Sequence, residues 1–107
     1  MFPGLGYSRT VGKELVRVHV IADGLVQGVA YRFFAEKYAA RLGITGWVRN
    51  LPDGRVEVLA EGTGDHVEAF LERLKEGPSL ARVDAFDVRR EPATGEFGDF
   101  RIAFLSD

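Results

Sequence analysis

The chain of 107 residues contains no cysteine. This absence excludes disulfide bonds, thiolate nucleophiles and zinc sites that are built on cysteine ligands. A chain that folds without disulfides is typical of a reducing compartment. We therefore expect the protein to be cytoplasmic.

Long apolar runs are also missing from the sequence. None approaches the roughly 20 consecutive apolar residues that a membrane-spanning helix requires, so we expect no contact with a membrane. The first 13 residues lack the charged segment and the following apolar segment of a secretory signal. Since the length suits one hydrophobic core, we expect a flexible N-terminal extension at residues 1–12 and a single domain at residues 13–107.

A strong excess of charge of one sign is absent as well. The formal net charge is -2, and the acidic and basic residues are interspersed along the chain. Binding to a nucleic-acid backbone requires clustered lysine and arginine, so we expect no nucleic-acid partner. The only histidines, His19 and His66, have no carboxylates around them at metal-ligand spacing. The sequence predicts no metal site and no cofactor, and we expect a monomer.

The first half of the chain predicts a strand that is followed by a helix. Residues 16–20 alternate valine with polar residues, which is the period of a half-buried strand, and this strand ends at Asp23 and Gly24. Apolar residues then recur at helical spacing over residues 31–42, and Gly43 follows in the C-cap position.

A hairpin and a second helix come next. Strand-like runs at residues 44–49 and 55–61 flank a Pro-Asp-Gly turn, which favours a hairpin. Asp65 as N-cap and Glu68 three residues later form a capping-box pattern, and the helix that it begins ends before Gly77.

Two further strands, at residues 83–89 and 100–104, complete the pattern, with a polar loop at residues 91–98 between them. The order βαββαβ with a short C-terminal edge strand predicts a ferredoxin-like α+β sandwich, in which both helices cover one face of an antiparallel sheet. Five aromatic residues are expected in the core, and two near the end either line a site or close the sheet edge: Phe33, Phe34, Trp47, Phe70 and Phe86, then Phe97 and Phe100.

A short loop with two glycines connects the first strand to the first helix. Gly24 and Gly28 can adopt backbone angles that turn successive N–H groups toward one point, and the helix N-terminus adds partial positive charge there. The loop lacks the lysine and hydroxyl residue of a Walker motif, and it lacks the Rossmann glycine spacing. The sequence therefore predicts a site for a phosphate-sized anion without a nucleotide-binding motif.

Arg32 lies in the first turn of this helix, where a cation opposes the helix dipole at a cost of roughly 0.3 to 1 kcal/mol. A residue that breaks a local preference in this way often has a functional role. A planar guanidinium beside inward N–H groups suits bidentate recognition of a phosphoryl or carboxylate group. The alternative is an arginine that extends into solvent, and the preceding loop favours the anion-binding role.

The sequence retains one asparagine and one glutamine, Asn50 and Gln27, and both lie in short glycine-bracketed runs. Asn50 ends the first strand of the hairpin, which we expect to lie next to the first strand of the chain, close to the glycine loop. An amide does not repel a bound dianion as a carboxylate would, and it can hold a water molecule in line with phosphorus. Ordinary turn chemistry before Pro-Asp-Gly is the alternative for Asn50.

These two runs resemble the paired signatures of the acylphosphatase family. The first is Gly24-x-Val-Gln-Gly-Val-x-Tyr-Arg32, and the second is Gly46-Trp-Val-Arg-Asn50-x-x-x-Gly54-x-Val56. The resemblance extends from about Leu15 to the end of the chain. Ala30, at a position that we take to be variable, and an N-terminal extension are the departures.

The resemblance implies hydrolysis of the carboxyl-phosphate anhydride of a small-molecule acylphosphate, without metal or cofactor. It implies that Arg32 binds the phosphoryl group and that Asn50 orients the attacking water. We hypothesise that a phosphoryl oxygen of the substrate accepts the proton of this water. Backbone amides of the loop would share in phosphoryl binding: Leu25, Val26, Gln27, Gly28, Val29 and Ala30.

Three alternatives stay open at this point. Ferredoxin-like sheets can bind single-stranded RNA, but the aromatic signature of that class is missing from this sequence. The chain could instead act with partner domains on carbamoyl phosphate, as in larger maturation enzymes that begin with such a domain. It could also bind a small anion such as phosphate without turnover, a role that would not need Asn50.

Overall fold

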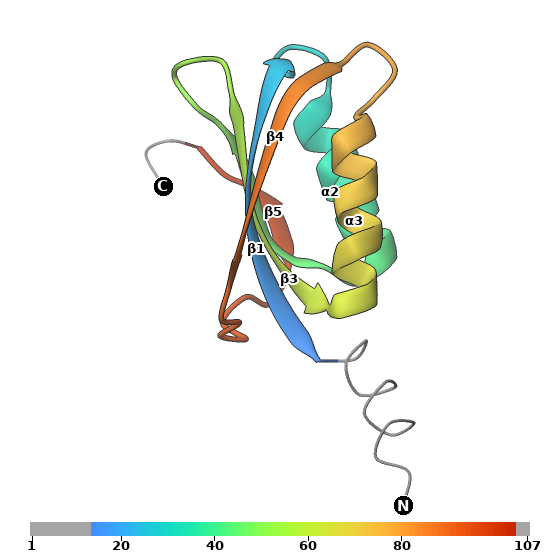
Figure 1. The fold of residues 1–107 in the computed structure, drawn as a ribbon, viewed down its shortest axis with the longest axis vertical. Helices are drawn as coiled ribbons and strands as arrows, with labels where there is room; N and C mark the ends of the chain where they lie inside the picture. The colour runs from blue at the N-terminus through green and yellow to red at the C-terminus, as the bar shows by residue number, and fades with distance from the viewer. Residues whose placement is uncertain (1–13, 105–107) are drawn as a thin grey trace, which may run out of the picture.

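Five strands and two helices follow one another in the predicted order (Figure 1). The computed structural model describes residues 14–104, so the N-terminal extension expected at residues 1–12 lies outside the described residues. The elements are β1 (Leu15–Leu25), α2 (Tyr31–Leu42), β2 (Thr45–Asn50), β3 (Val56–Thr63), α3 (Gly64–Glu76), β4 (Arg82–Glu91) and β5 (Phe100–Ile102).

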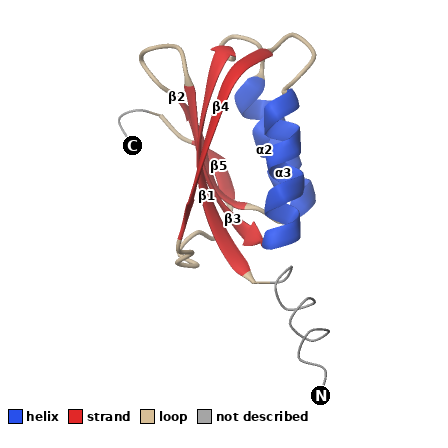
Figure 2. Cartoon of the chain, viewed as in Figure 1, coloured by secondary structure: helices blue, strands red, loops and turns tan. Residues whose placement is uncertain are grey.

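The strands form one sheet in the order β4-β1-β3-β2-β5, and both helices cover one of its faces (Figure 2). Neighbouring strands among β4, β1, β3 and β2 pair antiparallel, whereas the short edge strand β5 runs parallel to β2. The predicted ferredoxin-like α+β fold is confirmed, with a mixed sheet because of this last strand.

The expectation that β2 lies next to β1 is wrong, because β3 separates them. The β1-α2-β2 connection spans a gap of one strand, and the hairpin brings β3 back into that gap as the antiparallel partner of both neighbours. The β1–α2 loop and the β2–β3 turn nevertheless lie at the same end of the sheet (Figure 1).

Two element boundaries differ from the sequence prediction. Strand β1 continues to Leu25, because β4 pairs with it through a register shift at Asp23 and Gly24. Helix α3 begins at Gly64 with Thr63 as N-cap, and no side chain caps it, so the predicted capping box is wrong. The Asp65 carboxylate instead accepts a hydrogen bond from the Thr63 hydroxyl at 2.8 Å, and Glu68 forms an ion pair with Arg90.

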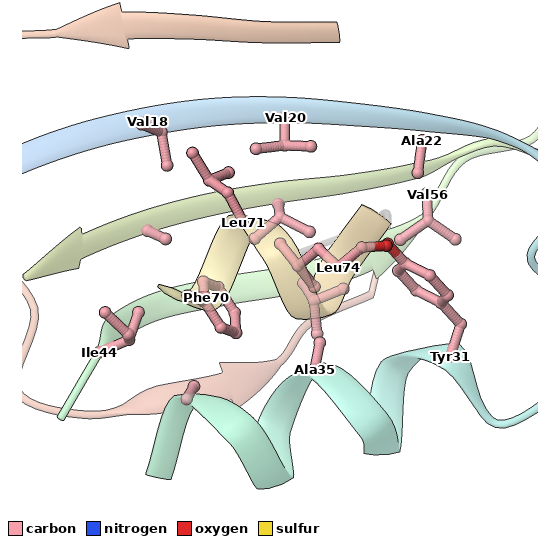
Figure 3. Packing of buried hydrophobic residues seen from close by; sticks show 14 of the residues in the cluster. Val18, Val20, Ala22, Tyr31, Ala35, Ile44, Val56, Phe70, Leu71 and Leu74 are labelled. Atoms are coloured by element: carbon pink, nitrogen blue, oxygen red, sulfur yellow. The ribbon is translucent and has the colours of Figure 1, made fainter. Parts of the chain in front are cut away.

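The hydrophobic core lies between the sheet and the helices (Figure 3). Helix α3 contributes Val67, Phe70, Leu71 and Leu74, while α2 contributes the smaller Ala35 and Ala39 beside Tyr31. Of the aromatic residues expected in the core, Phe70 is buried, and Phe34, Trp47 and Phe86 are partly exposed.

Phe33 was expected in the core, but its side chain is 65% exposed. The buried positions of α2 are Tyr31, Ala35 and Ala39, which repeat every four residues. Phe33 lies two residues after Tyr31 and therefore on the opposite side of the helix. Its apolar character has no packing role within the core.

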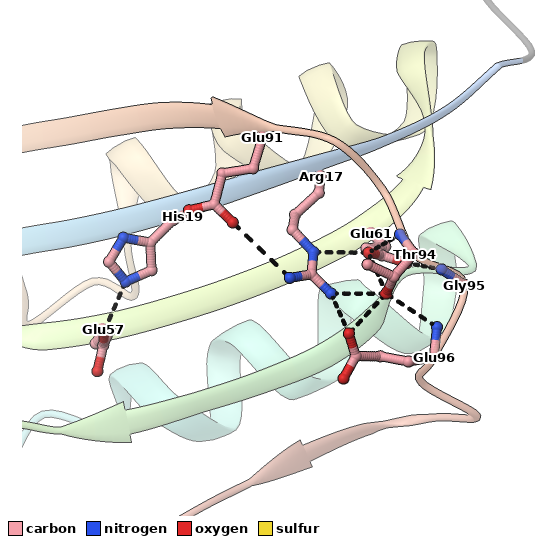
Figure 4. Close-up of polar contacts among 8 residues, drawn as sticks. All are labelled: Arg17, His19, Glu57, Glu61, Glu91, Thr94, Gly95 and Glu96. Carbon is pink, nitrogen blue, oxygen red and sulfur yellow. Dashed lines mark hydrogen bonds and ion pairs between the residues drawn. The ribbon is translucent and has the colours of Figure 1, made fainter.

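The other face of the sheet carries ion pairs, centred on Arg17 and Glu61 (Figure 4). Glu61 is 1% exposed and accepts hydrogen bonds from the Arg17 guanidinium at 2.7 Å and from the backbone N–H groups of Thr94 and Gly95. Burial opposes ionisation of this carboxyl, but these donors outweigh it and lower the pKa of Glu61. The cluster ties the loop after β4 to β1 and β3.

The two aromatic residues near the end of the chain have structural roles. The Phe97 ring packs against the Arg17 guanidinium, with 5.3 Å between the guanidinium carbon and the ring centroid. The Phe100 ring meets Phe70 edge-on, with 5.7 Å between their centroids. Of the two roles left open for them, the structure favours closing the sheet edge.

Candidate active site

The loop between β1 and α2 has an unusual backbone. Gly24, Gly28 and Ala30 all have positive φ angles, of 132°, 75° and 64°. At Gly24 a Cβ atom would lie 2.2 Å from the Arg82 carbonyl oxygen of the neighbouring strand, so only glycine fits there. Ala30 is the one non-glycine residue with positive φ among residues 14–104, and it stands directly before α2.

This backbone leaves a series of N–H groups without protein acceptors. Within the described part of the chain, the N–H groups of residues 27–30 donate no hydrogen bond to a protein atom. The first helical bond of α2 runs from the Phe34 N–H to the Ala30 carbonyl at 3.0 Å, so the first three N–H groups of the helix have no intrahelical partner either. Unpaired donors at a helix N-terminus attract anions.

A pocket of about 240 Å³ opens beside this loop. Its lining includes both Arg32 and Asn50. The sequence analysis expected these two residues to lie close together, and they do so although β2 is not adjacent to β1. Three predicted loop residues line it and three do not: Val26, Gly28 and Ala30 do, while Leu25, Gln27 and Val29 do not. Tyr31 and Phe33 complete the lining.

Arg32 differs from every other arginine of residues 14–104. Eight of the others form ion pairs, and Arg41 lies 5.4 Å from the centroid of the Tyr38 ring. Arg32 alone among these described arginines has neither kind of partner. Arg32 is half-buried at the positive end of a helix and has no counter-charge among residues 14–104, so it gives the pocket a local positive field.

Asn50 carries an unpaired atom into this environment. Its Oδ1 is buried and, among the side-chain atoms of the described residues, it is the one buried polar atom without a hydrogen-bond partner. Native structures satisfy most buried polar atoms, so an exception needs an explanation. An acceptor beside a cation and unpaired N–H groups suits a site that binds an anion and a water molecule.

Tyr31 also lines this pocket, but its hydroxyl is hydrogen-bonded to α3. The hydroxyl is buried and donates to the Leu74 carbonyl at 2.6 Å. The close-up of the core shows its oxygen beside Leu74 (Figure 3). Burial raises the pKa of the Tyr31 phenol above its usual value of 10.0. Tyr31 thus fixes α2 to α3 and is a poor candidate for proton transfer.

Sequence reasoning missed the role of the Gln27 side chain. Its Nε2 donates to the carbonyl oxygens of Leu51 and Arg55, at 2.8 and 2.9 Å. These bonds connect the loop to the turn that follows Asn50. The rarity of amides in this sequence was the only available signal, and it did not indicate the partners.

Residues 14–104 contain no group of three or more His, Cys, Asp or Glu side chains that could hold a metal ion. Within the same residues, neither helix has the length and apolar character needed to cross a membrane.

Comparison with known proteins identifies the family. A family model described as Acylphosphatase matches residues 18–102. The chain belongs to the acylphosphatase family. A relative named Acylphosphatase from Methylococcus capsulatus is 56% identical over 86 residues, which cover 80% of this chain and 94% of that protein. The family predicted from the two signature runs is confirmed.

Solved structures agree with this membership. A crystal structure of acylphosphatase from Bacillus subtilis matches with a TM-score of 0.80 at 35% identity, and the match covers 82% of this chain and 98% of that chain. Full-length HypF, solved in a phosphate- and nucleotide-bound form, matches with a TM-score of 0.75 at 29% identity. That match covers 85% of this chain but only 12% of HypF.

A second pocket shares Arg32 and Asn50 with the first and adds two residues that follow residue 102, where the acylphosphatase match ends. This pocket, of about 150 Å³, is lined by Arg32, Asn50, Ala103 and Phe104. The final strand was predicted to extend to residue 104, but β5 ends at Ile102. Sequence reasoning placed neither Ala103 nor Phe104 near the site.

Proposed function

We propose that this chain hydrolyses acylphosphates by direct attack of water on phosphorus, without a metal ion. The bond between phosphorus and the bridging carboxyl oxygen breaks, and its electron pair leaves with the carboxylate. A new bond forms between phosphorus and the water oxygen. The products are a carboxylate and dihydrogen phosphate, which together carry the two negative charges of the substrate.

The observation that carries this proposal is the group of unsatisfied polar atoms around one pocket. Arg32 has no counter-charge and the loop N–H groups have no acceptors within the described residues. A phosphoryl group supplies three oxygens for these donors, and a guanidinium can bind two of them at once. Donors that are fixed before the substrate arrives stabilise charge in the transition state without reorganisation.

Asn50 then has the role of orienting the nucleophile. Its buried Oδ1 can accept a hydrogen bond from a water molecule, while its Nδ2 can donate to a phosphoryl oxygen. Phosphoryl transfer has a loose transition state, which requires in-line alignment more than a strong nucleophile. An amide supplies that alignment without adding negative charge beside the substrate.

The reaction does not require a protein acid or base. A carboxylate leaving group has a pKa of about 4 and departs without protonation. Among the described residues that line the pocket there is no Asp, Glu or His, and the Tyr31 hydroxyl is bonded to Leu74. We assign the role of proton acceptor to a phosphoryl oxygen of the substrate. Loss of turnover on replacing any single Asp, Glu or His would contradict this assignment.

The test is turnover of benzoyl phosphate by the purified chain, with Arg32→Ala and Asn50→Ala beside it. Arg41→Ala is the matched control, because Arg41 lies on the same helix and lines neither pocket. We expect the wild type and Arg41→Ala to release phosphate and the other two variants to lose most of their activity. Phosphate binding without turnover in the wild type would instead support an anion-binding domain or one that acts only with partner domains.

The proposal extends to a monomer in the cytoplasm that binds no nucleic acid and uses no cofactor. Its support is the absence of cysteine and the interspersed charges of the sequence. Sedimentation at micromolar concentration is expected to give the mass of one chain, 11.8 kDa. A stable dimer mass would contradict this part of the proposal.

A further inference from the structure

Two adjoining pockets share Arg32 and Asn50 but differ in the rest of their lining. The larger pocket adds Gly28 and Ala30 of the loop, whose unpaired N–H groups suit a phosphoryl group. The smaller pocket adds only Ala103 and Phe104, both with apolar side chains. A substrate with one charged end and one apolar end would match this division.

The segment after β5 is held where it can form this second pocket. The Ala103 N–H donates to the Val48 carbonyl of β2 at 2.8 Å, so the chain continues along β2 toward Asn50 beyond the end of β5. Phe104 follows, and its side chain is 62% exposed. A single exposed apolar residue is ordinary, but this one borders the site.

We propose that the pocket of Ala103 and Phe104 receives the acyl group, and that the chain prefers acylphosphates with an aromatic acyl group. This inference rests on the proposed function. In the substrate one oxygen separates phosphorus from the acyl carbon, so the acyl group must leave the phosphoryl site beside the residues that contact that oxygen. Arg32 and Asn50 are the residues common to both pockets.

The size and chemistry of the pocket agree with a phenyl group. The pocket volume of about 150 Å³ equals that of an apolar cavity that holds benzene in another protein, and here Ala103 and Phe104 supply the apolar part of the lining. An aromatic acyl group can stack on the Phe104 ring or meet it edge-on, whereas a methyl group gains much less contact. The neighbouring Phe33 borders the phosphoryl pocket only and does not line this one.

The experiment compares benzoyl phosphate with acetyl phosphate, which differ only in the acyl group. The quantity of interest is the ratio of their kcat/KM values in the wild type, Phe104→Ala, Phe33→Ala and Leu80→Ala. Leu80 is an exposed control in the loop between α3 and β4, and it lines neither pocket. Comparing this ratio between variants cancels the intrinsic difference between the two leaving groups, because that difference is the same for every variant.

We expect the wild type to favour benzoyl phosphate and Phe104→Ala to lower the ratio roughly fivefold to tenfold, mainly through benzoyl phosphate. Phe33→Ala and Leu80→Ala are expected to keep the wild-type ratio. An unchanged ratio in Phe104→Ala, or a fall in Phe33→Ala alone, would overturn the assignment of this pocket. Failure of the wild type to hydrolyse either substrate would instead refute the proposed function.

Discussion

The side-chain amide of Gln27 donates a hydrogen bond to the carbonyl oxygen of Leu51 at 2.8 Å. A second bond from the same nitrogen reaches the Arg55 carbonyl at 2.9 Å. Leu51 follows Asn50 directly, and its own N–H donates to the Arg55 carbonyl at 2.8 Å. One amide therefore connects the β1–α2 loop to the end of β2, across the intervening strand β3.

Replacing Gln27 with Met keeps the length of the side chain and removes both donated bonds. We expect the free energy of unfolding to fall by about 1 to 2 kcal/mol, because two carbonyl groups lose a partner. We also expect kcat to fall roughly tenfold, since small misplacements of a catalytic group are costly. Denaturant unfolding and steady-state kinetics measure the two effects. Lower stability with an unchanged kcat would show that Gln27 supports the fold without positioning the site.

Arg32 and Asn50 are expected to affect different kinetic quantities. Arg32→Ala removes the cation that we propose binds the ground state and the transition state, so both the inhibition constant of phosphate and kcat should change strongly. Asn50→Ala should leave the inhibition constant of phosphate within about twofold and lower kcat by about a hundredfold or more. Equal loss of phosphate affinity in the two variants would contradict this division of roles.

Ala30 has a backbone conformation that favours glycine, with φ of 64° and ψ of 26°. Ala30→Gly should raise the free energy of unfolding by about 0.5 to 1 kcal/mol, since the left-handed region costs an L-residue more than glycine. The reverse change, Gly28→Ala, is the matched control, because φ is 75° there and a Cβ would meet no atom within 4 Å. Thermal unfolding should give opposite shifts for the two variants, and shifts of the same sign would exclude backbone strain as the cause.

Glu61 makes stability depend on pH. Its pKa is lowered in the folded protein, below the ordinary value of 4.5, so it contributes stability above pH 4.5 that is lost as the pH falls through the folded pKa. We expect Glu61→Gln to lower the free energy of unfolding at pH 7 by about 2 kcal/mol and to flatten its decline between pH 5 and pH 3. Glu72→Gln, on the exposed side of α3, is the control, and an equal decline in Glu61→Gln and wild type would contradict the assignment.

The elements and the fold class were predictable because they depend on local periodicity. Valine alternation indicated β1, and helical spacing with glycine at the end indicated α2. The same spacing places Phe33 on the exposed side of α2, whereas the expectation that Phe33 is buried rested only on its apolar character. The capping-box pattern failed because Thr63 competes for the Asp65 carboxylate, a contact that no pattern specifies.

Only the parts of the candidate site that lie in the two signature runs were predictable from the sequence. Arg32 and Asn50 lie in the two signature runs, whereas the contacts of Gln27 and the position of Phe104 depend on tertiary structure. The placement of β3 between β1 and β2 depends on pairing across the whole sheet. No sequence pattern indicated that Glu61 is buried, because the partners that stabilise its carboxylate, Arg17 and Thr94, are distant in sequence.

The most direct test of the central claim is hydrolysis of benzoyl phosphate in ¹⁸O-labelled water with EDTA present, followed by mass spectrometry of both products. Attack of water on phosphorus without a metal ion predicts undiminished turnover, with the label in inorganic phosphate and none in benzoate. Label in benzoate would place the attack at the acyl carbon, and loss of turnover in the chelator would show that a metal ion is required. Either result would contradict the mechanism assigned to Arg32 and Asn50.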